Sequence, residues 1–255
     1  MTSTLGRDLE LGDREVISLV GSGGKTALMF ALGRELSAHQ KGVLLTTTTK
    51  IWNPAPSPEF SLFLSKQFGE LRQWVEENLD RDRYLIVAQE KLDNGKLAGI
   101  PPFWVDELLS IQGLSHMIVE ADGGAGRPLK APREGEPVVP SATTLLIPVV
   151  GIDGLGCPLE DRHVFRAQIA IKILEKPEGT VINEEMIARL LAATLENKPH
   201  GARVIPFINK MDIPGGMEKG RRLARVLLES IPTKLEKVIL SQACKLPTVK
   251  EIVSR

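Results

Sequence analysis

The chain has 255 residues, 42% hydrophobic and 25% charged, and its 32 basic and 32 acidic residues give a formal net charge of zero. This balance argues against a general nucleic-acid-binding or membrane-surface protein. No apolar run reaches the roughly 18 residues of a membrane span, and residues 1–13 lack the pattern of a secretory signal. Cys157 and Cys244 stand in no metal-ligand spacing. We therefore expect a cytoplasmic protein in a reducing compartment.

The first informative segment in chain order is a glycine-rich loop. Residues 16–20 read VISLV and predict a buried strand, and leucines at 28, 32 and 36 predict a helix just beyond the loop. The loop itself comprises Gly21, Ser22, Gly23, Gly24, Lys25 and Thr26. Its glycines let successive N–H groups turn toward an anion, and the helix adds its positive N-terminus. The segment therefore predicts a phosphate-binding loop.

Within this loop, Lys25 is expected to reach the β- and γ-phosphates of a nucleotide and Thr26 to bind Mg²⁺. The loop is a variant of the usual G-x-x-x-x-G-K-[ST] pattern, because Leu19 occupies the position of the first glycine. The alternative is an ordinary glycine-rich turn from strand to helix.

An acidic strand end follows in the middle of the chain. Residues 117–120 read MIVE and predict a buried strand that ends in Glu120, with Asp122 two residues further on. An acid beside a phosphate loop serves Mg²⁺ directly or through a bound water, and both residues are candidates. They share a face only if the backbone stays extended, because side chains alternate along a strand. The alternative is an acidic surface turn.

Residues 122–133 combine glycines, prolines and three basic residues, and they cannot form a helix or a central strand. We expect this loop to move or to hold an anion, with Arg127, Lys130 and Arg133 near the γ-phosphate or an anionic acceptor. Lys25, Asp122 and Lys130 are the catalytic candidates. The alternative is a solvated connection.

A second nucleotide motif lies near the end of the chain. Residues 204–208 predict a strand, and Asn209, Lys210 and Asp212 follow it in an N-K-x-D pattern. The Asp212 carboxylate suits guanine N1–H and its 2-amino group, Asn209 the base edge, and the Lys210 stem the base face. Residues 241–243 follow the next apolar run and are a candidate supporting loop. The alternative is a turn in which Asp212 caps a helix.

Strand-like and helix-like runs alternate along the remaining chain. Further strands are expected at residues 43–45, 85–88, 145–149 and 238–240, and further helices at 165–173, 187–195 (capped by Asn183) and 223–227. Residues 46–50, TTTTK, suit either a strand end or a site. The pattern predicts an α/β fold, a P-loop NTPase-like three-layer sandwich with a mostly parallel sheet. The nucleotide loops bracket one domain over residues 1–255, with 1–13 as a candidate flexible arm.

Six segments together resemble a known family: VGSGGKT, TTTTK, VEADG, PLKAP, EPVVP and NKMD. They occur in the order and approximate spacing of the YqeC-type selenium-dependent hydroxylase accessory proteins, and the likeness spans nearly the whole chain. The resemblance implies a cytoplasmic P-loop protein that helps to mature selenium-containing molybdenum hydroxylases, with such a hydroxylase or its cofactor as partner.

Three functions are compatible with these observations. The first is a Mg²⁺-dependent GTPase that drives insertion of selenium or a molybdenum cofactor into a partner enzyme. The second is a kinase or nucleotidyltransferase whose acceptor is a small anion or cofactor precursor. The third is a sensor that binds GTP or another nucleoside triphosphate without turnover. No glutamine or arginine can be assigned from sequence to orient an attacking water.

Overall fold

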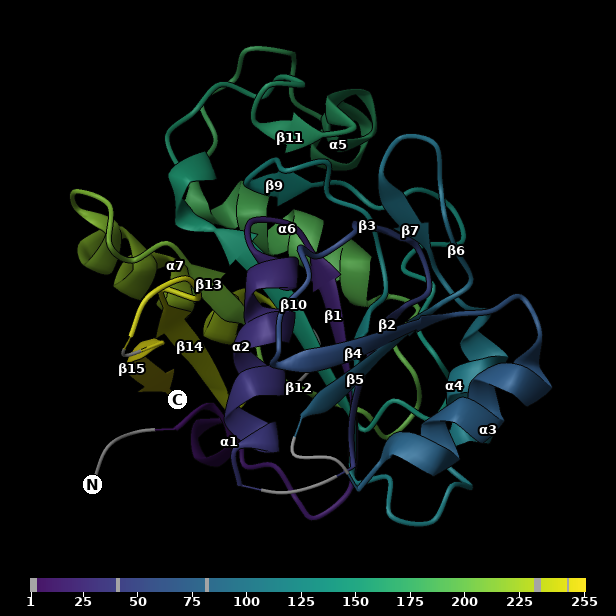
Figure 1. Cartoon of the computed structure of the whole chain (residues 1–255). Coiled ribbons are helices and arrows are strands. Elements are labelled where there is room, and N and C mark those ends of the chain that lie inside the picture. The colour runs from purple at the N-terminus through teal and green to yellow at the C-terminus, as the bar shows by residue number, and fades with distance from the viewer. Residues whose placement is uncertain (1–3, 40–41, 81–82, 232–234, 247) are drawn as a thin grey trace.

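The computed structural model describes residues 4–39, 42–80, 83–231, 235–246 and 248–255. These residues form an α/β fold around a ten-stranded sheet (Figure 1). From edge to edge the strands are β15 (Val249–Ser254), β14 (Lys237–Ser241), β13 (Phe207–Asn209), β10 (Leu145–Gly151), β1 (Glu15–Gly21), β8 (His116–Glu120), β2 (Val43–Thr47), β5 (Tyr84–Ala88) and β4 (Phe60–Leu64), and β12 (Arg203–Val204) also pairs with β10. β15 is antiparallel to β14, whereas the other described pairs of this sheet are parallel.

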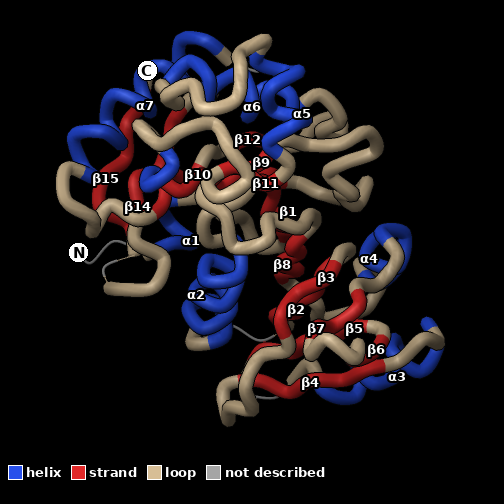
Figure 2. The backbone as a smooth tube through the Cα atoms, turned by 90° about the horizontal axis from the view of Figure 1, so that it is seen from above, coloured by secondary structure: helices blue, strands red, loops and turns tan. Residues whose placement is uncertain are grey.

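Helices cover both faces of the sheet, because both faces are apolar. Successive β1 residues Val16 and Ile17 belong to two different hydrophobic clusters. The first cluster holds buried residues of α3 (Phe68–Asn78), α4 (Pro102–Leu108), α5 (Ala167–Leu174), α6 (Glu184–Leu195) and α7 (Gly216–Ser230), and the second those of α1 (Leu5–Asp8) and α2 (Lys25–Ser37). In Figure 2, α2 lies on one side of the strands and α6 and α7 lie on the other. The expected three-layer, P-loop NTPase-like sandwich is confirmed.

Two small sheets and a short helix complete the described structure. One sheet has the order β3 (Lys50–Trp52), β7 (Lys96–Ala98), β6 (Glu90–Lys91), and the other pairs β9 (Leu129–Lys130) with β11 (Val164–Phe165). The 3₁₀ helix η1 (Ile152–Gly154) follows β10. In Figure 1, β9, β11 and α5 lie above the end of β1 at which α2 begins. The loop between β8 and β9 is therefore next to the candidate phosphate loop.

Two of the expected elements have different bounds in the structure, and several described elements, among them β4, β15, α3 and α4, were not expected. The strand expected over residues 204–208 is divided into β12 and β13, and Pro206 lies in the gap, where it has no N–H to donate. The helix expected from residue 165 begins only at Ala167, because Phe165 belongs to β11 and Arg166 adopts a left-handed conformation with φ 66°. By contrast, the expected cap of α6 is present: Met186 N donates to Asn183 Oδ1 at 2.9 Å.

The N-terminal segment packs onto the domain. Leu5 and Leu9 are buried, and the backbone N–H groups of Leu5 and Gly6 donate to the two carboxylate oxygens of Glu35 on α2, at 2.8 and 2.7 Å. Leu5 and Gly6 of the candidate arm thus lie against α2, while residues 1–3 fall outside the described structure. Of the helices described, none is long and apolar enough to span a membrane.

Candidate functional site

The glycine-rich loop joins the end of β1 to the start of α2. Its three glycines have φ values of 87°, 91° and 135°, which L side chains rarely adopt. A Cβ on Gly23 would overlap the backbone of Gly151, and one on Gly24 would overlap the Asn209 amide. The first N–H groups of α2 have no partner within the helix and are available to an anion. The loop is therefore a tight backbone cradle at a helix N-terminus, as a phosphate site requires.

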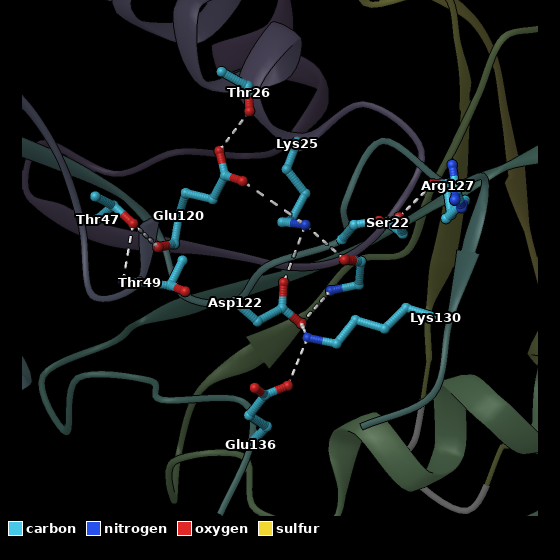
Figure 3. A network of polar contacts seen from close by, with 12 residues as sticks. Ser22, Lys25, Thr26, Thr47, Thr49, Glu120, Asp122, Arg127, Lys130 and Glu136 are labelled. Atoms are coloured by element: carbon cyan, nitrogen blue, oxygen red, sulfur yellow. Dashed lines mark hydrogen bonds and ion pairs between the residues drawn. The ribbon is translucent and has the colours of Figure 1, made fainter. Parts of the chain in front are cut away.

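Lys25, the first residue of α2, turns back over this cradle (Figure 3). Its side chain is 4% exposed, and its Nζ donates to Gly21 O at 2.6 Å. Nζ also lies 3.1 Å from Asp122 Oδ1 and 3.8 Å from Glu120 Oε1. Burial disfavours the charged form of this ammonium, but the two carboxylates outweigh burial and raise the pKa of Lys25. The lysine is therefore a charged group held between two acids.

The two candidate acids have different partners. Thr26 Oγ1 donates to Glu120 Oε2 at 2.7 Å, whereas Asp122 Oδ2 accepts from Gly21 N at 2.9 Å. Both carboxylates thus contact the phosphate loop and lie near Lys25. Burial raises the pKa of Glu120, and Lys25 and Thr26 offset only part of that effect. Glu120 is the acid beside the expected Mg²⁺ ligand, and Asp122 anchors the start of the loop.

A chain of buried ion pairs continues from Asp122. Lys130 Nζ lies 2.9 Å from Asp122 Oδ2 and 2.8 Å from Glu136 Oε2, and its side chain is 1% exposed. Arg166 binds both oxygens of Glu136, at 2.6 and 2.8 Å. Although burial acts in the opposite direction, hydrogen bonds from Arg166 and Lys130 lower the pKa of Glu136 to about 2. The network connects the phosphate loop to β9 and to the start of α5.

The basic residues of the 122–133 loop do not gather on the phosphate loop. Lys130 is enclosed by the two acids just described, Arg133 Nε lies 2.9 Å from Glu136 Oε1, and Arg127 Nε donates to Asp161 O at 2.7 Å. Instead, the backbone of this loop covers the site, because Ser22 Oγ donates to Gly124 O at 3.2 Å and to Arg127 O. A Cβ on Gly124 would lie 3.2 Å from Lys25 Nζ. The loop lies directly over the lysine.

Asn209 connects the two nucleotide motifs. It is 3% exposed; its Nδ2 donates to Gly23 O at 2.9 Å, and its Oδ1 accepts from Ala243 N at 2.8 Å and from Ser241 Oγ at 3.2 Å. The side chain expected at the base edge thus holds the phosphate loop against the 241–243 segment. That segment was expected to support the base loop, and the structure places it there.

The other two residues of the N-K-x-D pattern are more exposed. Lys210 has φ 69°, and its Nζ lies 2.7 Å from Asp153 Oδ2. Asp212 Oδ2 accepts from Lys245 at 2.6 Å, a bond that lowers the pKa of Asp212. Its side chain is 31% exposed and does not cap α7, which begins at Gly216 with Gly215 as its cap. An ionised Asp212 therefore lies at the surface beside Lys245.

Several residues of this arrangement had no role assigned from sequence alone. Asp153 and Arg166 are isolated charged residues in the sequence, and Glu136 stood out only as part of the EPVVP segment. The threonine run was ambiguous, and the structure gives two of its hydroxyls structural partners: Thr46 Oγ1 donates to Val87 O and Thr47 Oγ1 to Glu120 O, each at 2.8 Å. Thr47 thereby fixes the end of β8 from which Glu120 projects.

The donor set suits a cation completed by phosphate oxygens. Within the described ranges, no group of three or more His, Cys, Asp and Glu residues forms a metal site. Mg²⁺ in nucleotide sites typically uses one or two protein ligands together with phosphate and water. The adjacent Thr26 hydroxyl and Glu120 carboxylate match that requirement, so both Mg²⁺ and a triphosphate fit the residues present.

The fold and this site define an α/β protein with a glycine cradle, a buried lysine and an acid at the carboxyl ends of central strands in a mostly parallel sheet. The chain matches the family model described as "YqeC protein" over residues 17–168. It is 32% identical over 198 residues to "Uncharacterized protein YqeC" of Escherichia coli (strain K12), and the aligned region covers 76% of this chain and 75% of that protein. The chain belongs to the YqeC family.

Proposed function

We propose that this protein binds a Mg²⁺-bound guanine nucleoside triphosphate and hydrolyses it. The observation that carries the proposal is the 2.7 Å contact between Thr26 Oγ1 and Glu120 Oε2 at the start of α2, beside the buried ammonium of Lys25. A hydroxyl, a carboxylate and a lysine around a glycine cradle are the groups that a Mg²⁺-bound triphosphate requires.

Each group has a distinct role in this proposal. Lys25 would exchange its carboxylate partners for phosphate oxygens, Thr26 would ligate Mg²⁺, and Glu120 would hold the metal either directly or through a water. Asp122 and Lys130 position the cover of the site, because Asp122 bonds Gly21 N and pairs with Lys130. Hydrolysis transfers the γ-phosphoryl group to water and gives GDP and phosphate.

Guanine is the proposed base because of Asp212. Its ionised carboxylate can accept hydrogen bonds from both N1–H and the 2-amino group of guanine. Adenine does not have this pair of donors. The hydrogen bonds of Asn209 to Gly23 O and Ala243 N support the assignment, because they fix the distance between the phosphate loop and the segment beside Asp212.

Product analysis tests the reaction. Purified protein with Mg²⁺ and GTP should yield GDP and phosphate without an acceptor, and Thr26→Ala and Glu120→Gln should each lose turnover. As the control, Thr48→Ala removes an exposed hydroxyl that donates to Val138 O, and this variant should retain turnover. Turnover that requires an added acceptor would instead establish the transferase alternative. Tight binding without turnover would establish a sensor.

We further propose that hydrolysis serves the maturation of a selenium-dependent molybdenum hydroxylase. The resemblance of the six sequence segments to selenium-dependent hydroxylase accessory proteins supports this role, and the membership of the chain in the YqeC family agrees with that resemblance. Co-purification of the protein with such a hydroxylase should depend on nucleotide and should be lost in Lys25→Ala. Equal recovery with and without nucleotide would argue against a GTP-driven step.

A further inference from the structure

A cavity of about 330 Å³ lies along α2, between this helix and the segment that follows β14. Its α2 wall includes Ala31, Arg34 and Glu35, and its other wall includes Cys244, Lys245 and Leu246. The residues that line this cavity have no role in the phosphate site described above. One of them, Lys245, pairs with Asp212.

The position of the cavity relative to the phosphate loop is fixed. Ala31 follows Lys25 by six residues, so it lies about 9 Å further along the helix. The opposite wall begins at Ala243, whose N–H bonds the same Asn209 side chain that bonds Gly23 O. One buried side chain therefore sets the spacing between the phosphate cradle and the cavity. A nucleotide whose phosphates occupy the cradle and which extends along α2 would bring its sugar and base to this place.

We infer that this cavity receives the nucleoside end of the nucleotide, the ribose and the base. The inference rests on the proposed binding of a nucleoside triphosphate at the phosphate loop. It adds the region of the molecule in which the base lies and the α2 residues that contact it.

The walls have the chemistry that a nucleoside needs. Ala31 offers an apolar surface, and Leu246, at 89% exposure, is a large apolar side chain that a planar base would cover. Arg34 has a half-exposed side chain whose ion pair with Glu59 is long, at 3.9 Å, so it can turn toward ribose hydroxyls. Glu35 is held rigid by two N–H groups of the N-terminal segment.

The rim of the cavity connects it to base selection. Lys245 lines the cavity, and its ammonium bonds Asp212 at 2.6 Å, so the Asp212 carboxylate lies within one lysine side-chain length of the cavity wall. When a guanine base enters, Asp212 exchanges the Lys245 ammonium for the N1–H and 2-amino donors of the base. The Lys245 stem then remains beside the ring.

Cys244 provides a direct test, because it is exposed and lines the cavity. In a Cys157→Ser variant, Cys244 is the remaining thiol, and its alkylation by N-ethylmaleimide can be followed by mass spectrometry. Saturating Mg-GTP should slow alkylation by about tenfold or more, in proportion to occupancy. Mg-tripolyphosphate, which fills only the phosphate cradle, should leave the rate unchanged.

The converse experiment blocks the cavity in a protein that has already folded. Cys157→Ser labelled at Cys244 should bind GTP at least about tenfold more weakly, and tripolyphosphate with unchanged affinity. The matched control carries Cys157→Ser, Cys244→Ser and Glu77→Cys and is labelled on α3, on the opposite face of the sheet; it should bind both ligands as the unlabelled protein does.

The outcomes separate this inference from the proposed function. If GTP binds by calorimetry but neither protects Cys244 nor loses affinity on labelling, the nucleoside lies elsewhere and only the cavity assignment is overturned. If neither GTP nor tripolyphosphate binds, the phosphate site is wrong and the cavity assignment falls with it.

Discussion

The ammonium of Lys25 lies 3.1 Å from Asp122 Oδ1, so the lysine of the phosphate loop already has a carboxylate partner. A triphosphate bound as we propose would therefore compete with Asp122 for this cation. Asp122 cannot withdraw freely, because its second oxygen bonds Gly21 N and pairs with Lys130.

Asp122→Asn should bind Mg-GTP more tightly than the wild type, on the order of tenfold, because the variant removes a negative charge that competes with phosphate. The amide oxygen can still accept from Gly21 N. Calorimetry measures the affinity, and Glu120→Gln is the control, since it removes a charge on the metal side and should weaken binding. An Asp122→Asn protein that binds GTP less well than wild type would contradict the competition.

Lys25→Ala should destabilise the fold in addition to abolishing triphosphate binding. The sequence alone predicts a lysine that serves the ligand more than the core, whereas the structure buries it with Glu120 and Asp122. Removing one partner of a buried ion pair costs about 3–5 kcal/mol of unfolding free energy. Urea denaturation measures this loss. Lys66→Ala, which breaks the exposed pair with Glu90, should cost no more than about 1 kcal/mol, and equal losses in the two variants would refute the argument.

Glu136 should make stability depend on pH in the acid range. Its pKa in the fold is about 2, below the ordinary 4.5, so its contribution is complete above about pH 4.5 and is lost as the pH falls toward 2. Glu136→Gln should flatten the acid limb of a plot of melting temperature against pH. Glu134→Gln, which changes an exposed neighbour, should leave that limb unaltered. A wild-type limb that survives in Glu136→Gln would assign the acid sensitivity to other carboxylates.

Asn209→Ala should weaken both folding and nucleotide binding. The substitution leaves Ala243 N and Gly23 O without their partner, and an unsatisfied buried group costs about 1–3 kcal/mol. Denaturation measures the stability, and calorimetry with GTP measures the affinity. Lys210→Ala is the neighbouring control and should affect stability little, because its pair with Asp153 is partly exposed. Normal stability in Asn209→Ala would show that the two loops hold their spacing without this side chain.

Asp212→Ala should change base selectivity without changing stability. Loss of an acceptor paired with the base should cost on the order of 2–4 kcal/mol for GTP, or roughly 30- to 1,000-fold in affinity, with no loss for ATP. Titrations of both nucleotides against wild type and variant measure the difference. If wild type binds GTP and ATP equally, the guanine assignment is wrong even where the phosphate site holds.

The fold class, most strands of the ten-stranded sheet and the helices α2, α5, α6 and α7 could be predicted from local patterns in the sequence, whereas β4, β15, α3 and α4 were not predicted. Alternation of apolar runs indicated the parallel sheet, and the glycine loop marked the start of α2, because backbone conformation there depends on residue type over a few positions. Local patterns of apolar residues did not predict two of the element boundaries. The left-handed backbone of Arg166 delays the start of α5, and Pro206, which has no N–H, separates β12 from β13. The spacing of apolar residues indicates neither property.

The sequence by itself determined the composition of the candidate site: a glycine loop, a lysine, a threonine and an acid at the end of a strand. Only the tertiary structure decided which groups meet. It paired Thr26 with Glu120, enclosed Lys130 between Asp122 and Glu136, and turned Asn209 toward Gly23. These contacts join residues far apart in the chain, and their geometry depends on strand register and on the packing of α2. For the same reason, the cavity between α2 and the segment after β14 has no local signal in the sequence.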